Sequence, residues 1–155
     1  MKLEHQLTKP YYCIDTFGGF LSGDAEYEYA QRGKPRGIYQ SHEFSRNSKS
    51  RFELTLAHNG LNNVVAVQAD ASTVDYSQLG NGISFCLLDV DLYQPTIKAL
   101  PEIYRCVVPG GVIVVDDCEA GHQLWDGAYQ AYVEFCAVIG QPPQIVAGKL
   151  GVLRK

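Results

Sequence analysis

Short apolar runs alternate with segments of helical periodicity along most of this chain. The runs cover residues 11–14, 64–68, 83–88 and 112–115, and apolar residues at helical spacing fill residues 94–107 and 128–138. Consecutive strands that are joined through helices run parallel, and helices then cover both faces of their sheet. Two further runs, 144–147 and 151–154, are close enough to pair as an antiparallel hairpin. The pattern predicts an α/β fold with a mostly parallel sheet and a C-terminal hairpin.

The run at 83–88 is continuously apolar, which predicts a strand buried on both faces, and the run at 11–14 predicts a buried strand that leads into a loop. Residues 22–41 are rich in glycine, tyrosine and charge and have no steady period, so we expect a long, mobile connection with a short helix near 25–31. Connections of that length often act as lids. Ser45 or Asn47 is expected to cap a helix that ends near His58.

Composition narrows the class of protein. A length of 155 residues suits one domain, residues 1–155, and the net charge of −4 with no basic cluster argues against nucleic acid or an anionic membrane as partner. No apolar run reaches membrane-spanning length, and residues 1–10 lack the apolar stretch of a signal peptide. Five cysteines without CxxC spacing indicate reduced thiols. We therefore expect a cytoplasmic protein, with homo-oligomerisation left open.

Carboxylates follow each of the four predicted parallel strands. Because the carboxyl ends of parallel strands meet at one edge of the sheet, ligands bind there. A single aspartate at such a place usually caps a helix, but a group of them repels itself unless a cation binds or some members stay protonated. The sequence therefore predicts a site at this edge, built from six side chains: Asp15, Asp70, Asp89, Asp91, Asp116 and Asp117.

The Asp89-Val90-Asp91 segment has a further property. Alternate residues of an extended segment point to the same side, so one carboxylate can hold a metal while the other takes a proton. Asp116 and Asp117 add oxygens from the adjacent strand, and oxygen-only ligands favour Mg²⁺, with Mn²⁺ or Ca²⁺ as alternatives. The same motif occurs in metal-dependent glycosyl and phosphoryl transferases, which keeps that class open.

Asp15 suits a second role, because a carboxylate at a strand end can accept both hydroxyls of a ribose. Phe17 either lines an adenosine pocket beside it or packs in the core. Trp125 and the tyrosines at 27, 29 and 39 either contact an acceptor substrate or pack a helix and a lid.

Two segments carry a family resemblance: LLDVDLYQPT at residues 87–96 and VPGGVIVVDD at residues 108–117. With YCIDTFGGF at 12–20 and WDGA at 125–128, they make the chain similar to the macrocin O-methyltransferase family. The resemblance implies a Rossmann-like fold, S-adenosylmethionine as methyl donor, a divalent metal such as Mg²⁺, and a hydroxyl acceptor on a sugar or related natural product.

The resemblance also implies roles for single residues. Asp91 would be the general base for the acceptor hydroxyl, because a nearby carboxylate takes the proton that a bound metal acidifies. The sulfonium methyl is already activated, so alignment of oxygen and methyl is the main remaining task. The implied cofactor contacts are Asp15, Thr16, Phe17, Asp70 and Asp89, and the implied metal ligands are Asp89, Asp116 and Asp117.

Two departures from the family pattern stand out. The family has a further strand and a Gly-rich loop before the strand that ends at Asp15, whereas here only ten residues precede Tyr11 and none is glycine. We therefore expect an N-terminally truncated member that lacks the first, central strand of the fold. Cys118 stands where the family pattern has an aromatic residue. A non-catalytic remnant that binds only a partner or a metal is the second alternative.

Overall fold

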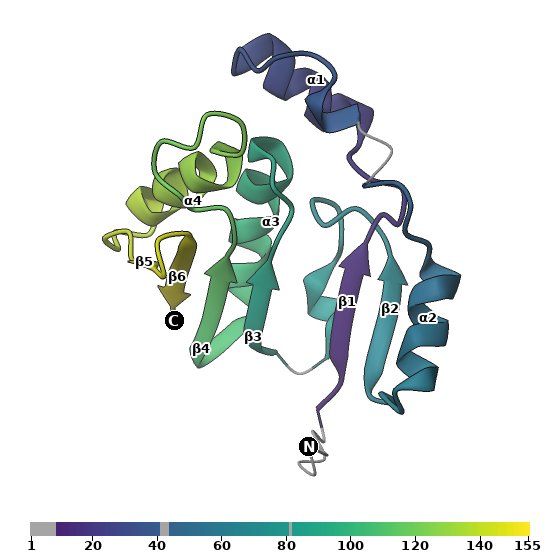
Figure 1. Cartoon of the computed structure of the whole chain (residues 1–155). Coiled ribbons are helices and arrows are strands. Elements are labelled where there is room, and N and C mark those ends of the chain that lie inside the picture. Colours follow the sequence, from purple (N-terminus) through teal and green to yellow (C-terminus); the bar gives the residue numbers. More distant parts are fainter. Residues whose placement is uncertain (1–8, 41–43, 81) are drawn as a thin grey trace.

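The computed structural model describes residues 9–40, 44–80 and 82–155 (Figure 1). Their elements follow in the order β1 (Tyr11–Asp15), α1 (Ser22–Gln31), the 3₁₀ helix η1 (Ile38–Gln40), α2 (Lys49–His58), β2 (Val64–Gln68), the 3₁₀ helix η2 (Tyr76–Leu79), β3 (Ile83–Leu88), α3 (Tyr93–Cys106), β4 (Val107–Val115), α4 (Gly127–Val138), β5 (Ile145–Val146) and β6 (Leu150–Arg154).

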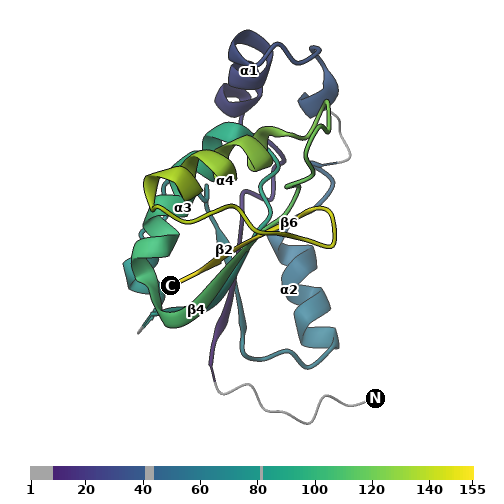
Figure 2. The same cartoon turned by 90° about the vertical axis from the view of Figure 1, so that its left-hand side faces the viewer.

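The strands form two separate sheets. β1 pairs with β2 in parallel, and the second sheet has the order β3-β4-β6-β5, in which β3 and β4 are parallel and β6 is antiparallel to both of its neighbours. Figure 2 shows α3 and α4 on one side of the strands and α2 on the other. The predicted α/β class, with helices on both faces and a C-terminal hairpin, is confirmed, and the fold is Rossmann-like.

The main core lies between the larger sheet and the pair α3 and α4. The helical spacing of α3 turns Ala99, Leu100 and Ile103 inward, and each is at most 1% exposed. Tyr132 of α4 is fully buried. Its hydroxyl lies within donating distance of the Gln144 and Val152 carbonyls and accepts the Gln144 N–H, which connects α4 to the hairpin. This core holds the carboxyl ends of β3 and β4 in fixed positions.

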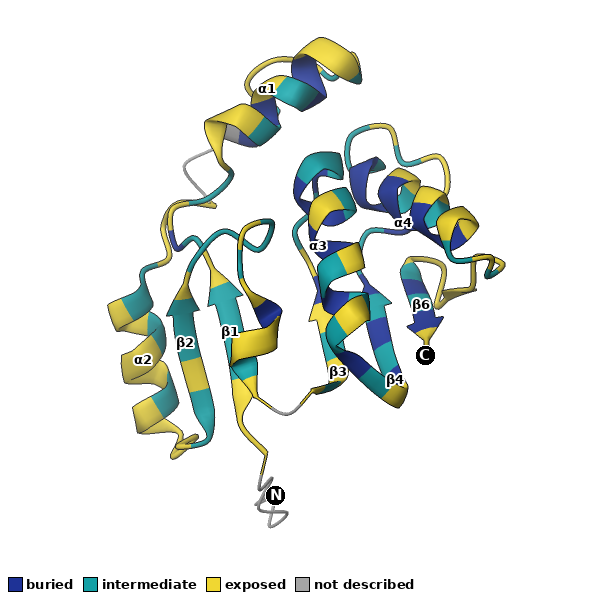
Figure 3. Ribbon diagram, turned by 180° about the vertical axis from the view of Figure 1, so that it is seen from behind, coloured by how far each residue is buried: buried dark blue, intermediate teal, exposed yellow. Residues whose placement is uncertain are grey.

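The prediction that β3 is buried on both faces was wrong, and β1 is less buried than its sequence predicted. Phe85 and Leu87 of β3 are about half exposed, as is Tyr11 of β1 (Figure 3). The reason is tertiary. In the described residues β1 and β3 each have a strand on one side only, and α2 packs against β2, so that face of β3 lies uncovered.

The segment after β1 contains more helix than its sequence predicted. The short helix expected near 25–31 is present as α1, which already begins at Ser22, and η1 follows it; position 41 lies outside the described residues. Tyr29, Tyr39 and Leu92 are buried together in a second, smaller core, which also includes Ala25 and contacts Phe20, Ile38 and Trp125. Tyrosine rings supply the apolar area that stabilises this helix, so its weak apolar periodicity was misleading.

Two element boundaries also differ from expectation. Ser48, and neither Ser45 nor Asn47, caps α2, with its Oγ accepting the Arg51 N–H at 3.3 Å. β4 already begins at Val107, so Pro109 lies inside a strand whose register with β3 shifts there. No helix in the described ranges is long and apolar enough to cross a membrane. The five cysteines are free thiols.

Candidate active site

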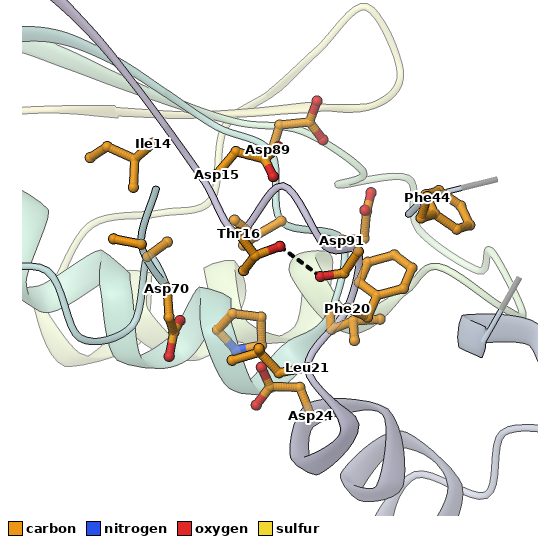
Figure 4. Close-up of a pocket in the computed structure, with 16 residues that line it drawn as sticks. Ile14, Asp15, Thr16, Phe20, Leu21, Asp24, Phe44, Asp70, Asp89 and Asp91 are labelled. Atoms are coloured by element: carbon orange, nitrogen blue, oxygen red, sulfur yellow. Dashed lines mark hydrogen bonds between the residues drawn. The ribbon is translucent and has the colours of Figure 1, made fainter. Parts of the chain in front are cut away.

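A pocket of about 150 Å³ lies where the carboxyl ends of β1, β2 and β3 approach α1 (Figure 4). No lysine or arginine lines it among the described residues. A concave surface with one sign of charge favours ligands of the opposite sign, so this pocket is suited to a cation. Its five carboxylates are Asp15, Asp24, Asp70, Asp89 and Asp91.

A tight turn positions the first of them. Asp15 Oδ1 accepts the Phe17 N–H at 2.5 Å, and Thr16 Oγ1 donates to the Gly19 carbonyl at 2.7 Å, the bond dashed in Figure 4. Phe17 takes a φ of 52°, which turns its ring away to pack on Phe52 of α2 at 5.9 Å between centroids. Asp15 and Thr16 therefore line the pocket, whereas Phe17 lines the neighbouring space between β1 and β3.

Asp70 reaches the pocket from the loop after β2. Its carboxylate accepts the Ser72 N–H at 2.8 Å and the Ser72 hydroxyl at 2.7 and 2.8 Å. These bonds fix the loop and hold the carboxylate in the pocket lining. Whether it contacts an adenine stays a prediction.

The strongest concentration of charge lies at the ends of β3 and β4. Leu88 pairs with Val115 in register, so the aspartates that follow each strand are neighbours. Asp89, Asp91 and Asp117 offer carboxylate oxygens that all lie within 4.8 Å of one another. Burial, the hydrogen bond to Asp117 and the charge of Asp89 together raise the pKa of Asp91 to about 8. Burial, then the charges of Asp116 and Asp117, raise the pKa of Asp89 as well. The cluster therefore favours either a proton or a cation.

Asp116 differs from its neighbours, because the Lys149 ammonium lies 2.8 Å from its Oδ1 and 3.4 Å from Asp117 Oδ1. Asp116 Oδ1 also accepts the Asp117 N–H at 2.8 Å. The three mutually close oxygens thus include Asp91 where the family resemblance implied Asp116. The assignment of Asp89, Asp116 and Asp117 as metal ligands stays a prediction. Asp116 lies next to the group of three and pairs with Lys149.

An ion-pair network attaches α1 above the pocket. Glu28 is 1% exposed, accepts the Tyr93 N–H at 2.8 Å and pairs with Arg32 at 2.7 Å. Arg32 continues to Asp126, just before α4, at 2.6 Å. The network brings Asp24 of α1 into the pocket lining.

Two charged residues near the site were missed in the sequence. Asp24 is an acidic residue in the first turn of α1, a recognisable helix-start signal, but the segment was interpreted as a mobile connection. Lys149 lies in the turn of the hairpin, and no local pattern links it to Asp116.

Aromatic rings form the pocket wall below α1. Phe20 and Phe44 both line the pocket, with centroids 4.7 Å apart. Trp125 packs against Phe44 at 5.8 Å and against Tyr39 at 5.2 Å. Tyr29 and Tyr39 are buried in the small core. Of the two roles predicted for them, the structure therefore shows packing.

The sequence around this site matches the model of a known protein family. The macrocin-O-methyltransferase (TylF) model matches residues 8–139, which include every carboxylate of the site. The chain belongs to this family. No curated protein sequence matches the chain.

Solved methyltransferases share the fold of this family member. CalS11, a calicheamicin methyltransferase, superposes with a TM-score of 0.70 at 18% identity, and the match covers 94% of this chain and 60% of CalS11. The O-methyltransferase NovP gives a TM-score of 0.69 at 16% identity, with the same coverage of 94% and 60%. A putative rRNA-methylase from Clostridium thermocellum gives 0.52 at 16%, covering 66% of this chain and 63% of that one. The chain thus spans about 60% of the length of CalS11 and NovP.

Proposed function

We propose that this chain carries the active-site half of an S-adenosylmethionine-dependent O-methyltransferase, assisted by a divalent metal, that acts on a hydroxyl of a sugar or a similar small natural product. The observation that carries the proposal is the acidic pocket at the carboxyl ends of the parallel strands, in a chain of the macrocin-O-methyltransferase family.

The pocket fits the methyl donor in charge. S-adenosylmethionine carries a sulfonium cation, and five carboxylates without a lysine or arginine line the pocket. Asp15 uses Oδ1 to close its own turn, which leaves Oδ2 to accept ribose hydroxyls. Thr16 and Asp70 complete the proposed cofactor side, while Phe17 supports the turn from behind.

The acidic cluster fits a hard divalent ion. Asp89, Asp117 and the neighbouring Asp116 would supply oxygen ligands only. Asp91 lies within 4.8 Å of the Asp89 and Asp117 oxygens and is reserved for the role of base. Such a set suits Mg²⁺ better than a soft metal. When bound, the ion would lower the pKa of the acceptor hydroxyl and orient it.

Asp91 is the proposed base. It lies in the pocket lining and touches the cluster, so it can face both the acceptor and the ion's position. The pKa of about 8 keeps it protonated at neutral pH while the cluster is uncompensated. With a cation held by Asp89, Asp116 and Asp117, that pKa would fall, and the Asp91 carboxylate would then accept the hydroxyl proton.

The acceptor class rests on names of relatives. The family is named for macrocin, and the apo CalS11 structure is described as a TDP-rhamnose 3'-O-methyltransferase. We therefore propose a sugar hydroxyl, with Phe20 and Phe44 as the apolar wall against which a sugar ring would lie.

Binding of S-adenosylhomocysteine, followed by amide chemical shifts, tests the proposal. We expect the amide signals of residues 14–19, 69–72 and 89–92 to shift, and Mg²⁺ to make these shifts larger. A preparation that is active should transfer a methyl group to TDP-rhamnose. UDP-glucose is the comparison ligand. If UDP-glucose binds at these residues and S-adenosylhomocysteine does not, the chain is instead a metal-dependent glycosyl or phosphoryl transferase.

A non-catalytic role is the second candidate, and the division of the sheet between β1 and β3 favours it. Mg²⁺ binding without any amide chemical shift change on addition of millimolar S-adenosylhomocysteine would support this candidate over the enzyme.

A further inference from the structure

The loop of residues 118–126 leads from the acidic cluster to α4. Side chains from the segment after α1 hold two of its carbonyl groups. The Lys34 ammonium donates to the Gln123 carbonyl at 2.7 Å, and the Tyr39 hydroxyl donates to the Leu124 carbonyl. The loop is therefore fixed from the α1 side of the pocket through its carbonyl groups.

His122 holds N–H groups of the same loop. Its Nδ1 accepts the Trp125 N–H at 3.1 Å and the Leu124 N–H at 3.4 Å. A ring nitrogen that accepts a hydrogen bond carries a lone pair, so the ring proton of this histidine lies on Nε2. The arrangement resembles an Asx turn, in which a side-chain acceptor binds the backbone a few residues further along. One imidazole nitrogen thus sets the backbone position of Trp125.

Trp125 transmits that position to the aromatic wall of the pocket. The centroid of its ring lies 5.8 Å from that of Phe44, 6.0 Å from that of Phe20 and 5.2 Å from that of Tyr39. Phe20 and Phe44 line the pocket, whereas Trp125 is not part of the lining. Because aromatic rings at these distances have preferred relative orientations, Trp125 supports the two rings that would face a ligand.

We propose that His122 is a positioning residue for acceptor binding, because its Nδ1 fixes Trp125 and Trp125 fixes the wall formed by Phe20 and Phe44. The inference rests on the proposed function for the identity of the acceptor. The cofactor side of the pocket is built from the end of β1 and from the loop after β2. Loss of His122 should therefore affect the acceptor and spare the cofactor.

The test compares two substitutions at this one position in the whole chain. His122→Ala removes the hydrogen-bond acceptor, whereas His122→Asn keeps one, because the amide Oδ1 is separated from the backbone by the same number of bonds as Nδ1. His58→Ala, at the exposed end of α2, is the matched control. Trp125 is the only tryptophan of the sequence, so tryptophan fluorescence reports on this loop directly.

We expect His122→Ala to shift the Trp125 emission to longer wavelength and to raise its quenching by acrylamide about twofold, because the ring loses part of its packing. His122→Asn should restore both values, and His58→Ala should leave them unchanged. Native emission in His122→Ala would overturn the proposal. So would a shift in His122→Asn as large as that in His122→Ala, because the bonds to Nδ1 would then not position the ring.

Two ligands separate positioning of the wall from a general structural role. Calorimetry should show about fivefold weaker binding of TDP-rhamnose in His122→Ala, recovery in His122→Asn, and unchanged affinity for S-adenosylhomocysteine in both. Equal losses for the two ligands would overturn the proposal, because His122 would then support the whole fold. Absence of TDP-rhamnose binding to the native chain would contradict the proposed acceptor, and with it the acceptor-binding role, whereas the Trp125 emission measures the His122 contact in either case.

Discussion

At the scale of single residues, this chain concentrates aspartates where strands end. Asp91 and Asp117 both take positive φ angles, 59° and 54°, in the left-handed region that aspartate tolerates better than most residues. These turns bring both carboxylates back toward Asp89, where burial and then mutual repulsion raise the pKa of Asp89 and Asp91. The geometry thus holds an electrostatic cost that a bound cation removes.

Mg²⁺ affinity should depend on Asp117. Asp117→Asn replaces one of the three clustered carboxylates with a neutral amide and should weaken Mg²⁺ binding by at least about tenfold. Asp116→Ala should also weaken it. Isothermal calorimetry with Mg²⁺ measures both, and Glu119→Gln, an exposed carboxylate two residues on, is the control. Unchanged affinity in Asp117→Asn would contradict the proposed site.

Lys149 should oppose the metal. Its ammonium pairs with Asp116 and Asp117 from a half-exposed position, so it competes for the same charge. Lys149→Met should tighten Mg²⁺ binding about two- to fivefold at low salt, the scale of an exposed ion pair. Lys149→Arg keeps the charge and serves as the matched control. Weaker binding in Lys149→Met would show that the lysine supports the site.

Turnover should depend on Asp91. Asp91→Asn removes a proton acceptor and little volume, so a preparation that turns over should lose about 10²-fold or more in kcat. Binding of S-adenosylhomocysteine should persist, because the ribose and adenine contacts are elsewhere. Native kcat in this variant would exclude Asp91 as the base.

At the scale of elements, α1 is attached by charge as well as by aromatic packing. The buried Glu28 carboxylate lies between the N-terminus of α3, through the Tyr93 N–H, and the Arg32 guanidinium. Gly127, at the start of α4, lets the chains approach closely there, since a Cβ would lie 2.6 Å from Tyr93 N. The N-termini of α3 and α4 therefore meet α1 around its one buried carboxylate, and α1 is held over the pocket.

Loss of Arg32 should detach α1. Arg32→Ala leaves Glu28 buried without its partner, which should lower the free energy of unfolding by about 3–5 kcal/mol. Arg36→Ala is the matched control, because Arg36 pairs with Glu26 in an exposed position and should have little effect. Urea unfolding measures both. Equal stability of the two variants would contradict an anchoring role for Arg32.

At the scale of the whole molecule, the division of the sheet is the dominant feature. The larger sheet shares a core with α3 and α4, whereas β1 and β2 contact chiefly each other and α2. The cofactor side of the pocket belongs to the smaller sheet and the acidic cluster to the larger one. Ligand affinity therefore depends on how firmly the two sheets are joined.

The chain alone should bind S-adenosylhomocysteine weakly and tend to self-associate. Open strand edges leave backbone groups unpaired, at about 1–3 kcal/mol for each buried one, and a marginally stable domain tolerates few of these. Calorimetry and light scattering over a range of protein concentrations measure the two effects. Tight binding by a monomer would show that the divided sheet already forms a complete site.

The sequence by itself determined the fold class and the acidic residues that lie at the carboxyl edge of the sheets. Apolar runs separated by helical patterns specify strands and crossovers locally, and the aspartates after them reach one edge by topology alone. Only the tertiary structure decided which of these groups come together. Burial of β1 and β3 depends on neighbouring strands, so an apolar sequence could not reveal that Phe85 is half exposed. Likewise Lys149 meets Asp116 through the hairpin, and Tyr39, which stacks on Tyr29 of α1, packs against Trp125 from much later in the chain. No local pattern encodes these contacts.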